Sequence, residues 1–114
     1  MSTTKAKPAA KKKPAVPTPA HPGELLFLEF LQPAKISQLR LATATGISVS
    51  RINDLIKGRR GITPDTAIRL AAALGVTPQL WLNLQHDYDM RVARLQKADE
   101  YAAIVKLPEL ANAA

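Results

Sequence analysis

Residues 37–66 read SQLRLATATGISVSRINDLIKGRRGITPDT, and this segment is the most informative part of the chain. It predicts two short helices, over 37–45 and 48–57, that meet at Gly46. Ser37 and Ser48 stand where helix N-caps are expected, and Gly46 is free to adopt the positive φ that ends the first of the two helices. This arrangement is typical of a helix-turn-helix, whose second helix enters the major groove of DNA.

A further helix is predicted ahead of this stretch, over Glu24–Leu31, because a glutamate suits the positive start of a helix. We expect Pro33 to end it, since proline interrupts helices. The inward-facing residues of this helix are expected to be Leu25, Leu28 and either Phe30 or Leu31. The helix over 37–45 is expected to turn Leu39, Leu41 and Ala42 inward.

Two longer helices are predicted after residue 61. The fourth helix begins with Thr63 as N-cap and Pro64 at the first helical position, and Gly75 closes it. Its apolar stripe is expected to be Ile68, Ala71, Ala72 and Leu74. The fifth begins in the same way at Thr77, and its apolar residues recur at spacings of three and four: Trp81, Leu84, Tyr88, Val92 and Leu95. The prediction is an all-α, five-helix domain that contains the helix-turn-helix.

The third helix has one apolar side and one polar side. At 100° per residue, Ile52, Leu55 and Ile56 cluster on the side that packs inward. The opposite side carries Ser50, Asp54 and Lys57, with Arg51 and Asn53 placed laterally. Such a face offers hydrogen bonds to base edges and charge to phosphates, although any soluble helix is polar outside. We expect Asp54 to pair with Arg51 or Lys57 rather than to face DNA.

The predicted DNA contacts lie in the two helices and in the loop after them. Gln38 begins the second helix, where a side chain can bridge a phosphate and the reading helix. The remaining predicted contacts are Ser48, Val49, Ser50, Arg51, Asn53 and Lys57. Ser48 also has a purely structural interpretation as a cap, and Val49 either touches a thymine methyl or completes the core. Arg59 and Arg60, between two glycines, are predicted to contact the phosphate backbone, the alternative being that they are only solvated.

The charge of the chain is uneven. The net charge is +7, of which five lysines put +5 on residues 1–20 and leave +2 on residues 21–114. Six cations lie within residues 35–60 against a single acid, whereas residues 86–109 hold five acids. The positive charge is therefore concentrated around the predicted reading helix.

Three segments are predicted from composition. Residues 1–20, rich in Lys, Pro and Ala, are expected to be a disordered tail, either a solubilising leader or a cationic arm that attracts phosphate. Residues 21–96 form the DNA-binding domain, and residues 97–114 a flexible or partly helical extension. A signal peptide and a membrane-spanning run are absent from the sequence, so a cytoplasmic protein without membrane contact is expected.

Catalysis and metal binding find little support. The chain has no cysteine, which excludes disulfides, zinc-thiolate sites and thiol nucleophiles. His21 and His86 are far apart in sequence and are interpreted as surface residues. Asp87 and Asp89, two residues apart, project from different helix faces. We expect no enzyme activity, no metal and no cofactor.

The run from His21 to Gln96 resembles the HigA-type antitoxins, in the wider Xre class of phage-repressor-like helix-turn-helix proteins. The segments that carry the resemblance are HPGELL, SRIN with GRRGITPDTA, and TPQLWLNLQHDYD. The basic leader of twenty residues departs from the family pattern.

The resemblance implies a lambda-repressor-like helix-turn-helix fold and a homodimer that binds an inverted-repeat operator in double-stranded DNA. It also implies a cognate RelE-like, mRNA-cleaving toxin as protein partner. In this family the later helices build the dimer, which here implies Trp81, Leu84, Tyr88 and Val92. Two alternatives stay open: a repressor without a toxin partner, and an adaptor that binds a protein through its acidic C-terminal half.

Overall fold

The computed structural model describes residues 20–110, and every regular element within them is a helix. The elements are α2 (Pro22–Leu25), the π-helix η1 (Leu26–Leu31), α3 (Gln32–Ala34), α4 (Gln38–Thr45), α5 (Val49–Ile56), α6 (Pro64–Leu74), α7 (Pro78–Gln96), α8 (Ala98–Ala102) and the 3-10 turn η2 (Pro108–Leu110). The predicted all-helical class is confirmed. The tail predicted over residues 1–20 lies outside the described residues, apart from residue 20.

The four predicted N-caps and the two predicted glycine stops after them are confirmed. Ser37, Ser48, Thr63 and Thr77 are the N-caps of α4, α5, α6 and α7, and each side-chain oxygen accepts a backbone N–H three residues on. Gly46 ends α4 at φ 77° and Gly75 ends α6 at φ 73°. These signals are read correctly because a cap depends on its immediate neighbours in the chain.

The first helix runs from Pro22 through Pro33 to Ala34, so the prediction that Pro33 ends it was wrong. Its middle part, η1, is a π-helix, in which Gln32 donates its N–H to the carbonyl of Phe27, five residues back. The helix ends instead at Lys35, which takes the left-handed conformation at φ 58°.

The π-helix also changes which residues of the first helix face inward. Leu26 and Leu31, five residues apart, are both buried, whereas Leu28 is exposed and Leu25 half-buried. The predicted set assumed 3.6 residues per turn, and the wider π turn brings residues at a spacing of five onto one side.

Two other predicted apolar stripes need correction. On α4, Leu41 and Ala42 are buried but Leu39 is exposed, because residues two apart point about 200° from each other on a helix. On α6, Ile68 and Ala72 are exposed, while Ala71 is buried and Leu74 half-buried as predicted. The buried residues of α6 are Thr66, Ala67, Leu70 and Ala71. α6 itself carries apolar residues on most of its sides, so periodicity alone did not identify the buried stripe.

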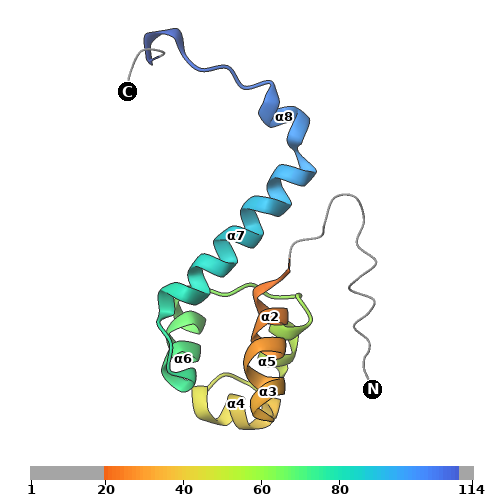
Figure 1. Cartoon of the computed structure of the whole chain (residues 1–114), viewed down its shortest axis with the longest axis vertical. Helices are drawn as coiled ribbons and strands as arrows, with labels where there is room; N and C mark the ends of the chain where they lie inside the picture. The colour runs from red at the N-terminus through yellow and green to blue at the C-terminus, as the bar shows by residue number, and fades with distance from the viewer. Residues whose placement is uncertain (1–19, 111–114) are drawn as a thin grey trace.

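The core joins the first helix to all four that follow. Trp81, from the first turns of α7, is fully buried, and its ring lies 5.3 Å from that of Phe30 between centroids. The other core residues are Leu26, Leu31, Leu41, Ala42, Ile47, Ile52, Leu55, Ile62, Ala67, Leu70 and Ala71. The C-terminal half of α7 leaves this body, and α8 and the last described residues continue away from it (Figure 1). None of the described helices is long and apolar enough to cross a bilayer.

The segment at the start of the first helix packs tightly on α5. Gly23 is buried, and a Cβ atom there would lie 1.6 Å from the carbonyl oxygen of Leu55. His21 is half-buried rather than a surface residue: its Nδ1 accepts the N–H of Gly23 at 2.9 Å, and its ring lies 4.8 Å from that of Tyr88. Burial lowers the pKa of His21, while the carboxylates of Asp89 and Glu24 partly oppose this effect.

Candidate nucleic-acid interface

The turn between α4 and α5 is held in place by α6. Arg69 donates from Nη1 to the carbonyl oxygen of Thr45 at 2.9 Å, and from Nε to both carboxylate oxygens of Asp65. Thr45 in turn donates its hydroxyl to the carbonyl of Leu41 and accepts the N–H of Ile47. These bonds satisfy backbone groups at the end of α4. The turn that orients α5 is therefore held both by Arg69 of α6 and by the side chain of Thr45.

The two faces predicted for α5 are present. Ile52 and Leu55 are buried and Ile56 is half-buried, whereas Ser50 and Lys57 are exposed. Ser48 and Val49, at the start of α5, are exposed as well, and Gln38, at the start of α4, is half-buried. The N-terminal part of a recognition helix makes the base contacts in helix-turn-helix proteins. The start of α5 therefore offers exposed side chains where such contacts are made.

Arg51 lies partly beneath the beginning of α6. Its Nη2 atom lies 3.4 Å from the hydroxyl oxygen of Thr66, and its buried Nε makes no hydrogen bond to the described residues. The hydroxyl of Thr66 also bonds that of Thr63, the N-cap of α6, at 3.2 Å. Arg51, on α5, is thus half-buried beside the start of α6, and its side chain is less accessible to a ligand than that of Ser50.

Asp54 pairs with Arg59 and not with either of its predicted partners. Its carboxylate accepts from Nη1 of Arg59 at 3.0 Å, so the predicted pairing with Arg51 or Lys57 was wrong. After α5 the backbone turns at Gly58, where φ is 77°, and this turn brings Arg59 back over the helix. The helix periodicity used for the prediction did not include the loop.

Within residues 38–60, three exposed cations have no acid within salt-bridge distance among residues 20–110: Arg40, Lys57 and Arg60. Arg40 was not among the predicted contacts, although the sequence places it two residues after Gln38 on the same helix. Asn53 is half-buried on the side of α5. The helix pair therefore presents hydroxyl groups, an amide and uncompensated positive charge together, which suits a polyanion with hydrogen-bonding base edges.

Comparison with known proteins agrees with this geometry. A family profile described as Helix-turn-helix matches residues 28–81, which include α4, α5 and α6. Virulence-associated protein I of Dichelobacter nodosus is 45% identical over 91 residues, which are 79% of this chain and 81% of that protein. Antitoxin HigA-1 of Vibrio cholerae is 43% identical over 88 residues, which are 77% of this chain and 82% of that antitoxin. This chain belongs to the HigA antitoxin family.

A solved structure in this family includes DNA. The Pseudomonas aeruginosa antitoxin HigA with the higBA promoter is 36% identical to this chain, with a TM-score of 0.74. The match covers 79% of this chain and 98% of that antitoxin. The resemblance stated from the sequence is confirmed, and the expectation that the chain is not an enzyme agrees with its membership of this family.

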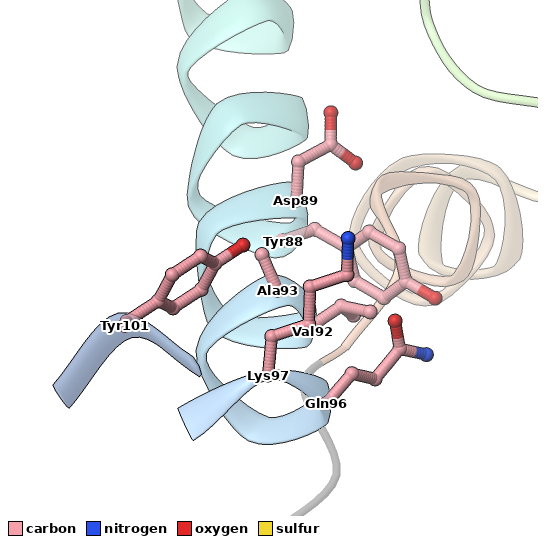
Figure 2. Close-up of a pocket in the computed structure, with 7 residues that line it drawn as sticks. All are labelled: Tyr88, Asp89, Val92, Ala93, Gln96, Lys97 and Tyr101. Atoms are coloured by element: carbon pink, nitrogen blue, oxygen red, sulfur yellow. The ribbon is translucent and has the colours of Figure 1, made fainter. Parts of the chain in front are cut away.

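A second surface lies on α7 and α8. A hollow of about 280 Å³ is lined there by Tyr88, Asp89, Val92, Ala93, Gln96, Lys97 and Tyr101. Figure 2 shows these side chains along the C-terminal turns of α7 and at α8. Of the residues implied for a dimer, Leu84, Tyr88 and Val92 are half-buried, whereas Trp81 is fully buried in its own chain. Within the described residues, no group of three or more His, Cys, Asp or Glu residues is placed to hold a metal ion.

Proposed function

We propose that this chain binds an inverted-repeat operator as a homodimer and neutralises a RelE-like, mRNA-cleaving toxin encoded beside it. The main support for DNA binding is the exposed start of α5, which is held by α6 and flanked by Arg40, Lys57 and Arg60. The promoter complex of the Pseudomonas aeruginosa HigA supports it, because that antitoxin shares this fold.

In the proposed complex the start of α5 reads bases, and the cations around it contact phosphates. The base-reading residues are Ser48, Val49, Ser50, Arg51 and Asn53. Gln38, Lys57, Arg59 and Arg60 contact the backbone. Arg59 is 57% exposed in its pair with Asp54, so it exchanges a weak surface ion pair for a phosphate contact.

The proposed domain spans residues 21–96, and α7 supplies the two-fold contact through Leu84, Tyr88 and Val92. Trp81 supports this contact from the core below it. Residues 97–114 are an extension outside the domain, and the basic residues 1–20 add attraction to phosphates. A two-fold axis would place the two copies of α5 about one duplex turn, ~34 Å, apart.

DNA binding is tested by fluorescence anisotropy of the full chain with the promoter region upstream of its gene. Lys57→Ala is expected to weaken binding to operator and random DNA alike and to reduce the slope of log affinity against log salt by about one. Ser50→Ala is expected to weaken operator binding alone. Lys106→Ala removes an equal charge far from α5 and is the matched control. Equal losses on both DNAs for Ser50→Ala would overturn the assignment of the reading face.

Antitoxin activity is tested by growth of cells that express the short reading frame adjacent to this gene, with and without this chain. Growth arrest that this chain relieves supports the proposal. A harmless neighbour would reduce the function to that of a plain repressor. Relief of toxicity without any operator binding would instead identify a protein-interaction adaptor.

A further inference from the structure

The turn between α4 and α5 borders an open groove. Two of its lining residues, Ser48 and Val49, belong to the base-reading set proposed above, whereas Leu39 does not. Its volume is about 410 Å³, and Leu39, Ala42, Thr43, Ile47 and Val49 are among its lining residues. Leu39 is 65% exposed and Val49 is 41% exposed. Neither side chain is needed to close the core, so two aliphatic groups are left on the face that we propose meets DNA.

The polar groups of this groove are partly occupied. Thr43 donates its hydroxyl to the carbonyl of Leu39 at 3.0 Å, and the Ser48 oxygen accepts the N–H of Arg51 at 3.1 Å. The groove therefore offers mainly methyl groups to a ligand. Beside Leu39, the exposed Arg40 supplies a positive charge without an acidic partner among the described residues.

Major-groove edges of base pairs carry hydrogen-bond donors and acceptors and one kind of apolar group, the C5-methyl of thymine. An apolar groove at the start of a recognition helix fits that group and none of the others. We propose that Leu39 and Val49 form a pocket for a thymine methyl in each operator half-site. This inference rests on the proposed operator binding and names one base that the operator must contain.

The pocket adds Leu39, on α4, to the residues that determine specificity. Burying one methyl group corresponds to ~0.8 kcal/mol, or about fourfold in affinity. A symmetric operator has two such positions, so loss of both methyls is expected to weaken binding by about fifteenfold.

The test uses operator duplexes in which deoxyuridine replaces thymine, because uracil lacks the methyl but keeps the pairing edge. Each thymine of the half-site is replaced in turn, together with its symmetric copy, and the affinity of the full chain is measured by anisotropy. One position is expected to show about a fifteenfold loss. In Leu39→Ala and Val49→Ala, binding to the thymine operator weakens, and the difference between thymine and uracil at that position shrinks toward onefold.

Ile68→Ala, which truncates a 58% exposed aliphatic side chain on α6, is the matched control and should keep the full uracil effect. Thermal unfolding of each variant verifies that the fold is retained, as expected for exposed positions. The inference is overturned if uracil is harmless at every position, or if the uracil effect is unchanged in both pocket variants. Failure of the wild-type chain to bind the thymine operator would overturn the proposed function as well.

Discussion

The Nη1 atom of Arg69 lies 2.9 Å from the carbonyl oxygen of Thr45, and this bond ties α6 to the last residue of α4. Arg69→Met is expected to lower the free energy of unfolding by about 1 kcal/mol, because a half-buried carbonyl at the helix end loses its donor. Asp65→Asn weakens only the exposed ion pair and should cost less than about 0.5 kcal/mol. Urea unfolding of both variants measures the difference, and equal losses would contradict the role given to Thr45.

Gln85 is a buried amide that links α7 to the loop before α6. Its Oε1 accepts the N–H of Ile62 at 2.7 Å, and its Nε2 donates to Asp89 at 3.0 Å. Gln85→Ala is expected to cost about 1–3 kcal/mol, because the buried N–H of Ile62 is left without an acceptor. Gln79→Ala, on the exposed side of α7, is the matched control and should change stability by less than about 0.5 kcal/mol. Similar midpoints in urea for the two variants would argue against the bridge.

Substitution by alanine is expected to destabilise the fold at two glycines, for a different reason at each. At Gly23 a Cβ atom would lie 1.6 Å from the Leu55 carbonyl oxygen, so the first helix must separate from α5. At Gly75 nothing lies within 4 Å, and the cost is only that of the left-handed backbone, about 1–2 kcal/mol. Thermal unfolding followed by circular dichroism should show a much larger loss for Gly23→Ala. The steric argument is wrong if Gly23→Ala melts at or above the temperature of Gly75→Ala.

Stability is expected to fall as the pH falls below 7, because of His21. Burial holds the pKa of this histidine below its usual 6.5, so the unfolded chain takes up the proton first. The contribution is complete above pH 6.5 and is lost as the pH falls toward the folded pKa. Protonation would also remove the acceptor that Nδ1 presents to Gly23.

The pH effect is measured by urea unfolding between pH 7.5 and 5.5. His21→Asn keeps a capping oxygen without a titrating group, so its unfolding free energy should depend less on pH than that of the wild-type chain. His86→Asn removes an exposed histidine and is the control. An unaltered pH slope in His21→Asn would exclude His21 as the cause.

Caps and turns were predictable from sequence because each depends on a few adjacent residues. Ser48 and Gly46 needed no knowledge of the rest of the chain. The choice of inward-facing residues was less predictable where the helix departs from 3.6 residues per turn, as in η1. It was also less predictable on α6, where Ile68 and Leu70 are both apolar but only Leu70 faces the core.

The proposed interface was predictable to the level of helices and faces but not of individual partners. The pairing of Asp54 with Arg59 depends on how the loop after α5 folds back. The contact between Arg51 and Thr66 depends on where α6 begins in space. Both are tertiary relations between segments, which the spacing of residues along one helix does not contain.

Lys35 ends the first helix in a conformation that Gly46, Gly58 and Gly75 adopt elsewhere in the described chain. A residue with a Cβ atom carries a penalty of about 1–2 kcal/mol there, and glycine would remove most of it. The lysine instead places an exposed positive charge two residues before the cap of α4. Lys35 therefore lowers the stability of the fold but adds positive charge to its surface. Lys35→Gly is expected to raise the free energy of unfolding and to weaken the attraction to polyanions.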